Sequence, residues 1–380
     1  MPKMTPRERM LATFARQPVD CFPVTAPYLM LTQSDHWTKI TGQPSWTFYE
    51  WNLLEPTAHL DEYQRYYDLL PFDIAQPQSW EVDCATRRDC RIETAPDGHY
   101  RVNTRTGARE KLIENLHEKD QNAAWPRTVY SKKDADERIP LRAVEDLIAD
   151  GHLDNFSAYA QRWGKERFLA GTVVNSFYGS TWSVGLTNRF MLLLDEPELM
   201  HYIINRFSES NIREIQALAK AGCDAVFIDD ATATNDMISA KMYREFSLPY
   251  LRRQVEAIQN LGMKAILIYF GGIADRVEDI VSTGADGLLM ETSMKGYVND
   301  LESIAAQVND RMLLFGNLDP VADLELASDE QLVTRMAAQI TVGKRIGRFV
   351  VSTGSPLTPD TSLARMQTYV RLGHELSAFK

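Results

Sequence analysis

Four polar side chains that could do chemistry follow short apolar runs in the second half of the chain. Asp229 and Asp230 are adjacent, and Glu291 and Asn317 end two later runs. Two neighbouring carboxyl groups beside apolar walls can raise the pKa of one of them, which then serves as an acid near neutral pH. Successive side chains at a strand end point in opposite directions, so one of the pair faces a site and the other caps the next helix. The sequence leaves open which one faces the site, and Asn317 has an alternative role as a turn residue.

The runs that carry these residues predict the fold class. Five short apolar runs between Cys223 and Pro356 each stop at a polar or glycine-rich tip, and helix-length stretches separate them. Short buried strands that alternate with helices indicate a parallel sheet covered on both faces. We therefore expect an α/β protein with a closed (β/α)8 TIM-type barrel, in which the loops after the strands build the active site at one mouth. The runs are residues 226–230, 266–272, 287–291, 312–317 and 349–354.

Aromatic residues and a glycine pair form a second group of candidates. The aromatic segment starts at Tyr28 and includes Trp37, Trp46, Phe48, Tyr49 and Trp51; its rings either pack a helical lid over the barrel or line a pocket for a flat ligand. The pair Gly271-Gly272 either allows a large planar ring to approach the backbone or forms a tight turn. The candidate substrate contacts are Tyr28, Trp46, Tyr178, Trp182, Tyr269 and Asn317.

The whole chain, residues 1–380, fits one barrel domain. Thr5-Pro6-Arg7-Glu8 predicts a capped helix over residues 6–16, and residues 23–27 predict a short strand. Alternating polarity joined by Asp-Gly and Thr-Gly turns predicts a β-rich insertion, an antiparallel meander, within residues 80–125. Residues 141–153 are typical of a surface helix, and helical periodicity runs through residues 200–220.

Composition excludes several classes of function. A net charge of -11 and a pI near 5.2 argue against nucleic acid as a partner. The four cysteines show no metal-binding or disulfide spacing, which favours reduced thiols. No apolar stretch approaches the length of a membrane span, so we expect a cytoplasmic protein without a membrane contact. A homodimer remains open.

Several motifs resemble the uroporphyrinogen decarboxylase superfamily. They are Asp224-Ala-Val-Phe-Ile-Asp-Asp, Ile268-Tyr-Phe-Gly, Phe315-Gly-Asn-Leu-Asp-Pro and the opening Arg7-Glu-Arg-Met-Leu-Ala. The resemblance covers most of the chain and implies a TIM-type barrel. The superfamily includes decarboxylases and cobalamin-dependent methyltransferases, so the fold does not choose the reaction.

The departures from the superfamily favour its cobalamin-dependent methyltransferase branch, which includes O-demethylase-like methyltransferases. The decarboxylases carry an arginine-rich segment after the first strand, where this chain has Thr25-Ala-Pro-Tyr-Leu-Met-Leu-Thr, and their late histidine is replaced within Ser352-Thr-Gly-Ser-Pro. The methyltransferase branch resembles this chain in Asp195-Glu-Pro-Glu-Leu, in the acidic pair and in the β-rich insertion. The chain lacks the Asp-x-His-x-x-Gly corrinoid motif, which implies that the corrinoid is carried by a separate partner protein.

Thiol-methylating members of that branch bind zinc through a His-x-Cys strand end and a later cysteine. The corresponding positions here are Ile268, Phe270 and Ser355, so a zinc site of the thiol type is not expected. The resemblance therefore implies the other half-reaction, in which a small methylated substrate, an aromatic methyl ether above all, gives its methyl group to Co(I).

The protein must then stabilise the leaving group by protonation or with a Lewis acid. The predicted catalytic residues are Asp229, Asp230 and Glu291, and the predicted corrinoid contacts are Gly271 and Gly272. A metal held by the oxygen ligands Asp229, Asp230 or Glu291 stays open. So do three alternatives: a uroporphyrinogen-type decarboxylase, a methyltransferase for methylamine or another N- or S-methyl donor, and a barrel that binds a ligand without catalysis.

Overall fold

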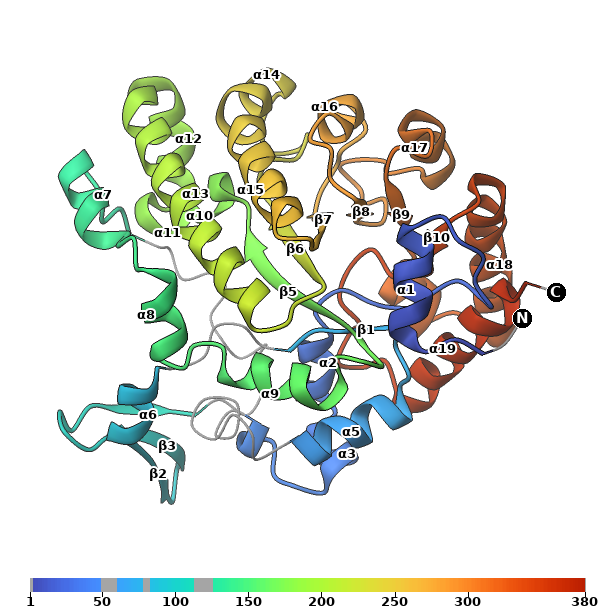
Figure 1. Cartoon of the computed structure of the whole chain (residues 1–380), viewed down its shortest axis with the longest axis horizontal. Helices are drawn as coiled ribbons and strands as arrows, with labels where there is room; N and C mark the ends of the chain where they lie inside the picture. Colours follow the sequence, from blue (N-terminus) through green and yellow to red (C-terminus); the bar gives the residue numbers. More distant parts are fainter. Residues whose placement is uncertain (1–2, 49–59, 78–82, 113–125, 380) are drawn as a thin grey trace.

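The computed structural model describes residues 3–48, 60–77, 83–112 and 126–379 (Figure 1). Its main sheet has seven strands in the order β1-β5-β6-β7-β8-β9-β10, and every adjacent pair is parallel. Helices surround this sheet in Figure 1. The predicted α/β barrel is confirmed. The strands are β1 (Ile74–Ala75), β5 (Phe168–Val174), β6 (Ala225–Asp230), β7 (Lys264–Tyr269), β8 (Gly287–Met290), β9 (Leu313–Phe315) and β10 (Phe349–Val350).

The segment around Val24 closes the barrel between β10 and β1. Val24 forms a parallel bridge with Val351, and the Val24 carbonyl accepts a hydrogen bond of 2.9 Å from the Asp73 N–H, just before β1. The strand predicted over residues 23–27 is thus reduced to a single bridge. Proline at both ends explains this, because Pro23 and Pro27 have no N–H to donate to a ladder.

Alternate residues of the strands fill the barrel. Phe168, Ala170, Ala225, Phe227 and Ile266 belong to one buried cluster, while the residues between them pack outward against the helices. Met10 and Phe14 of α1 (Pro6–Phe14) join the inner cluster, and Phe14 stacks on Phe168 with ring centroids 5.8 Å apart. Helix α1 therefore plugs the end where the strands begin and leaves the other end for chemistry. Its predicted Thr5 capping box is present, and it ends two residues earlier than predicted.

The helical layer has a long element after β5 and shorter ones elsewhere. Helix α13, the longest of the described part, has 24 residues and packs against α15. The helices are α2 (Leu29–Asp35), α3 (Trp37–Thr41), α5 (Leu60–Leu69), α6 (Cys84–Asp89), α7 (Lys132–Arg138), α8 (Val144–Ala149), α9 (Asp154–Trp163), α10 (Ser176–Gly179), α11 (Thr181–Val184), α12 (Leu186–Asp195), α13 (Pro197–Lys220), α14 (Ala240–Met242), η2 (Tyr243–Ser247), α15 (Leu248–Asn260), α16 (Val277–Val281), α17 (Leu301–Val308), η3 (Pro320–Glu325), α18 (Asp329–Ile346) and α19 (Leu363–Ser377).

The described part of the insertion is a small antiparallel sheet of β2 (Cys90–Ala95), β3 (Gly98–Asn103) and β4 (Arg109–Lys111). It lies at the edge of the molecule beside α6 in Figure 1. The predicted meander is therefore present in the described part of the insertion. The segment that ends at Cys84, which was expected to be its first strand, instead leads into helix α6, which begins at Cys84. Asp83 caps that helix by accepting the Thr86 N–H at 2.8 Å. Residues 80–82 and 113–125 of the predicted insertion, and Tyr49 and Trp51 of the aromatic segment, lie outside the described residues.

The four cysteines are free thiols, Cys21 and Cys223 buried and Cys84 and Cys90 partly exposed. Among the helices in the described ranges, none combines the length and the apolar character that crossing a membrane requires.

Candidate active site

The register of β6 determines the direction in which the side chains of Asp229 and Asp230 point. Asp229 is in phase with Ala225 and Phe227, which face the barrel interior, whereas Asp230 is in phase with the residues that face the helices. Both carboxyl groups are buried, at 6% and 1% exposure. Asp229 thus points into the barrel at the carboxyl end of β6, and Asp230 points away from it.

The two carboxyl oxygens of Asp229 differ in their hydrogen bonding. Its Oδ2 accepts a short hydrogen bond from the Tyr28 hydroxyl, while its Oδ1 is buried and has no hydrogen-bond partner in the described part of the chain. Burial raises the pKa of Asp229 to about 7, although the Tyr28 hydrogen bond lowers it, and the charge of Asp230 adds to the rise. Near neutral pH, a large fraction of Asp229 therefore carries a proton that it can donate.

Tyr28 is held in a conformation that is unusual for a residue with a side chain. It adopts φ 52° and ψ 51°, the left-handed region, at the start of α2. For an L-amino acid this costs about 1–2 kcal/mol. Its ring stacks on Phe270 with centroids 5.6 Å apart, and burial and the nearby Asp229 raise the pKa of its hydroxyl well above the usual value. Tyr28 therefore stays a neutral donor to Asp229 at physiological pH.

Asp230 caps the turn that follows β6. Its Oδ1 accepts the backbone N–H groups of Thr232 and Ala233, both at 2.7 Å, and its Oδ2 has no partner in the described residues. Burial raises the pKa of Asp230, and the two backbone donors and the positive charge of Arg189 counteract that rise. One member of the acidic pair was expected to cap the next helix; Asp230 caps this turn instead, and Ser239 caps α14.

Arg189 of α12 is a buried cation close to the same strand end. Its Nη1 donates to the Phe177 carbonyl, the Thr181 hydroxyl and the Thr232 hydroxyl at 3.1, 2.7 and 3.0 Å. Its Nε and Nη2 have no partner in the described part of the chain, and burial lowers the pKa of the guanidinium to about 10. The charge of Arg189 helps to balance Asp230.

Glu291 follows β8 in phase with Leu289, which belongs to the inner cluster. Two donors hold its carboxyl: the Tyr297 hydroxyl donates to Oε2 through a short hydrogen bond, and the Ser355 hydroxyl donates to Oε1 at 2.8 Å. Burial and Glu291 raise the pKa of Tyr297 well above its usual range. Glu291 is therefore fixed in position by groups from its own loop and from the segment after β10.

Asn317 belongs to an amide network that joins three loops. Asn299 donates from Nδ2 to the carbonyl groups of Gly271 and Glu291, both at 3.0 Å, and accepts the Ile273 N–H at 3.1 Å. Asn317 donates to the Asn299 carbonyl at 2.9 Å. The amide of Asn317 thus ties the end of β9 to the loops after β7 and β8.

The aromatic candidates fall into two groups. Tyr178 is partly buried, and burial and the charges of Asp229 and Asp230 raise its pKa, while Trp182 is 46% exposed beside it with ring centroids 6.2 Å apart. Tyr269 faces the helices, where its hydroxyl meets that of Tyr243 at 2.8 Å. Trp46 stacks on His99 of the small sheet at 4.1 Å. Tyr178 is therefore close to the acidic pair, whereas Tyr269 and Trp46 have packing partners elsewhere.

Gly271 and Gly272 are closely surrounded by side chains of the protein itself. A Cβ on Gly271 would lie 2.6 Å from Thr234 Oγ1, and one on Gly272 would lie 1.9 Å from Asn235 Oδ1. Internal packing accounts for both glycines, and their predicted contact with a corrin ring stays a prediction.

Sequence reasoning missed Asn299, Arg189 and Tyr297 as parts of this site. Each lies in a loop or helix rather than at a strand tip, so no strand-end signal marks it. It treated Phe270 and Ser355 only as positions where zinc ligands are replaced, yet Phe270 stacks on Tyr28 and Ser355 holds Glu291. Ile268 lies in the inner cluster. In the described ranges, no group of three or more His, Cys, Asp or Glu side chains is arranged to hold a metal ion.

Comparisons with known proteins place the chain among its relatives. The profile of the family "Uroporphyrinogen decarboxylase (URO-D)" matches residues 129–376, more than half of the chain. A uroporphyrinogen decarboxylase of Pseudomonas fluorescens (strain Pf0-1) is 30% identical over 219 residues, which cover 53% of this chain and 58% of the relative. The methylcobamide:CoM methyltransferase MtbA of Methanosarcina acetivorans is 24% identical over 223 residues, covering 56% of this chain and 61% of the relative. The chain spans about three fifths of the length of these two relatives.

A solved methyltransferase from Methanosarcina mazei has a similar fold, with a TM-score of 0.70 at 17% sequence identity. The match covers 99% of this chain and 100% of that chain. At this identity, the likeness concerns the fold.

Proposed function

The chain belongs to the uroporphyrinogen decarboxylase (URO-D) family, and we propose that it is a corrinoid-dependent methyltransferase that demethylates a small methyl ether, in particular an aromatic one. The observation that carries this proposal is Asp229. Its carboxyl group faces the barrel interior, has a pKa raised to about 7 and keeps Oδ1 without a partner in the described structure. An acid of this kind suits a reaction whose leaving group is a phenolate.

Demethylation of an ether whose phenolate is a poor leaving group needs a proton on the oxygen that loses the methyl group. In the proposed reaction, the bond between the methyl carbon and the ether oxygen breaks, the electron pair stays on oxygen, and oxygen takes the proton from Asp229 Oδ1. Tyr28 donates to Oδ2 throughout and stabilises the carboxylate that remains. The corrinoid, bound to its carrier protein, supplies the Co(I) nucleophile that accepts the methyl group.

The surroundings of Asp229 suit a flat substrate. The ring of Tyr28, which donates to Asp229, stacks on Phe270, and Tyr178 of α10 is close enough for the charge of Asp229 to raise its pKa. Aromatic walls with few polar groups are typical of pockets for ring compounds. The anchored carboxylate of Glu291 can accept a hydrogen bond from a ring hydroxyl, which would favour methoxyphenols over simple anisoles.

Exposed apolar side chains support a protein carrier for the corrinoid. We call them the apolar rim, because each follows the carboxyl end of β5, β8 or β9 and so belongs to the mouth side of the barrel. Exposed apolar residues gathered at one end of a protein are candidate contacts for a partner protein. The apolar rim comprises Trp182, Leu186, Met294, Val298, Val321 and Leu326.

The proposal is tested with cob(I)alamin as the methyl acceptor and a panel of methoxyphenols, anisoles, methylamines and methyl thioethers as donors. Spectral change of the cobalt and loss of the donor methyl signal by NMR should occur together with an aromatic ether. Free cob(I)alamin avoids the need to know the carrier protein. Absence of transfer from every ether, with this acceptor and with corrinoid carrier proteins, would refute the proposal.

Decarboxylation remains a second candidate, because the matching profile and the Pseudomonas relative bear that name. Arg189 is a buried cation near Asp230, but the segment of residues 25–32 contains no arginine to hold a polycarboxylate. Release of carbon dioxide from uroporphyrinogen without methyl transfer would favour this alternative.

A further inference from the structure

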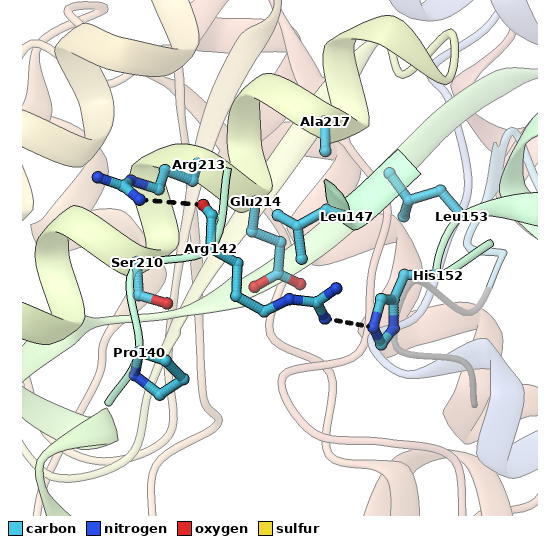
Figure 2. A pocket seen from close by; sticks show the side chains of 9 residues that line it. All are labelled: Pro140, Arg142, Leu147, His152, Leu153, Ser210, Arg213, Glu214 and Ala217. Atoms are coloured by element: carbon cyan, nitrogen blue, oxygen red, sulfur yellow. Dashed lines mark hydrogen bonds between the residues drawn. The ribbon is translucent and has the colours of Figure 1, made fainter. Parts of the chain in front are cut away.

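A cavity lies on the outer side of the barrel, and its lining residues are not those of the proposed active site. It is formed between α13 and the segment that carries α8, and its volume is about 220 Å³ (Figure 2). At about 30 Å³ for each water molecule, that volume holds roughly seven waters. It is smaller than the usual range for drug-sized ligands, so only a small molecule would fit.

One carboxyl group in this cavity has no partner. Glu214 of α13 lines the cavity together with Ser210, one helical turn away, and no hydrogen bond or ion pair of the Glu214 carboxyl occurs in the described structure. Figure 2 shows the carboxyl in the middle of the lining residues. Burial raises the pKa of Glu214 to about 7. The Glu214 side chain is partly exposed to the cavity, where a proton or an external cation can neutralise it.

The two arginines that line the cavity already have acceptors. Arg142 forms an ion pair with Asp150 and contacts His152 Nε2 at 2.7 Å. Arg213 donates to the carbonyl groups of Leu141 and Arg142 at 2.5 and 3.1 Å. In Figure 2, the Arg142 guanidinium is turned toward His152, and that of Arg213 lies at the opposite side of the cavity. Glu214 is therefore the charged lining group that a ligand has to satisfy.

The rest of the lining is apolar. Pro140, Leu147, Leu153 and Ala217 cover the cavity around the carboxyl. An apolar part of the lining next to one unpaired carboxylate suits a molecule with a short hydrocarbon body and a single cationic donor. A divalent metal would find only one carboxylate here, which is too few for stable coordination.

We propose that this cavity is a binding site for a small organic ammonium ion, with its N–H groups on Glu214 and its hydrocarbon part against Leu147, Leu153 and Ala217. The ammonium group replaces the proton that otherwise neutralises Glu214. Ser210 offers a second acceptor, since its hydroxyl has no hydrogen bond within the described residues. This site is separate from the proposed methyl-transfer chemistry.

The probe for this site is n-butylammonium chloride, with 1-butanol and sodium butyrate as neutral and anionic molecules of matched size. Binding to the full chain is measured by calorimetry and by ligand-observed NMR at about pH 8.5 and about pH 5.5. With a pKa near 7, the ionised fraction of Glu214 falls from about 97% to about 3%, so the affinity for the ammonium ion should fall about thirtyfold.

Three variants locate the binding. Glu214→Gln removes the charge at nearly constant shape, and Ser210→Leu fills the cavity while Glu214 remains; each should abolish binding. Glu145→Gln is the control, because Glu145 pairs with Lys220 at 3.0 Å and does not line the cavity. It should bind n-butylammonium as the wild type does.

A loss of binding in Glu214→Gln cannot be attributed to a loss of folding stability. The pKa of Glu214 in the folded chain lies above its ordinary value, so its ionisation destabilises the fold as the pH rises through about 7. Glu214→Gln should therefore melt at the same or a higher temperature at about pH 8.5. No binding by the wild type, equal binding of 1-butanol or butyrate, or retained binding by Glu214→Gln would overturn the proposal.

Discussion

Asp229 is the residue whose charge state decides whether the proposed reaction can occur. Asp229→Asn keeps the shape of the side chain and an oxygen that accepts from Tyr28, but it has no proton to donate to an ether oxygen. We expect demethylation to fall about 10²–10⁴-fold, the usual worth of a general acid. Single-turnover methyl transfer to cob(I)alamin measures the loss. A rate within about threefold of the wild-type rate would contradict the assignment of Asp229 as the acid.

The pH dependence offers a second test at the residue scale. The active form carries the proton, so kcat/KM should fall as the pH rises through about 7. Tyr28→Phe removes a hydrogen bond that lowers the pKa of Asp229, and the fall should then move to higher pH. Asp230→Asn removes a charge that raises that pKa, and the fall should move to lower pH. Shifts in the same direction in both variants would exclude Asp229 as the titrating group.

Among the elements, the loops after β7, β8 and β9 depend on one asparagine. Asn299→Ala removes two hydrogen bonds to carbonyl groups and one from the Ile273 N–H, all buried or partly buried. We expect a loss of about 2–4 kcal/mol in the free energy of unfolding, measured with urea.

Asn309→Gly serves as the control for that experiment. Asn309 ends α17 in the left-handed conformation, with φ 47°, which glycine adopts without strain. Its stability should stay close to that of the wild type. An equal loss in the two variants would show that the amide network carries no special stability.

The strands β6 to β10 were accessible from the sequence because each is a short apolar run with a polar or glycine-rich tip, whereas the two-residue strand β1 was not predicted. The acidic pair could be named for the same reason. Its two members could not be told apart, since that requires the register of β6 against β5 and β7. The strand at residues 23–27 was overestimated because proline limits its pairing to one bridge.

Contacts between distant segments were not accessible at all. Tyr28 and Asp229 are 201 residues apart in the chain and meet only because the barrel closes. The left-handed conformation of Tyr28 has no signal in its residue type, since such a backbone favours glycine or asparagine. Ser355 and Glu291 likewise come together across the mouth from two loops.

For the whole molecule, the apolar rim predicts how a carrier protein docks. Leu326 and Val298 are 72% and 65% exposed. Leu326→Asp and Val298→Asp should raise the KM for a corrinoid carrier protein and leave transfer to free cob(I)alamin unchanged, because the rim contacts protein rather than substrate.

Leu261→Asp is the matched control for the rim. Leu261 is 42% exposed but lies just before β7, on the opposite end of the barrel. It should affect neither acceptor. If Leu261→Asp and the rim variants raise the KM equally, the carrier does not dock at the mouth.

The most direct test of the central claim varies the leaving group. Single-turnover demethylation to cob(I)alamin is compared for wild type and Asp229→Asn with 4-nitroanisole, whose phenolate leaves without a proton, and with 2-methoxyphenol, whose phenolate needs one. The account predicts that Asp229→Asn retains most activity on 4-nitroanisole and loses about 10²-fold or more on 2-methoxyphenol. An equal loss on both ethers would contradict the role of Asp229 as the acid that protonates the leaving oxygen.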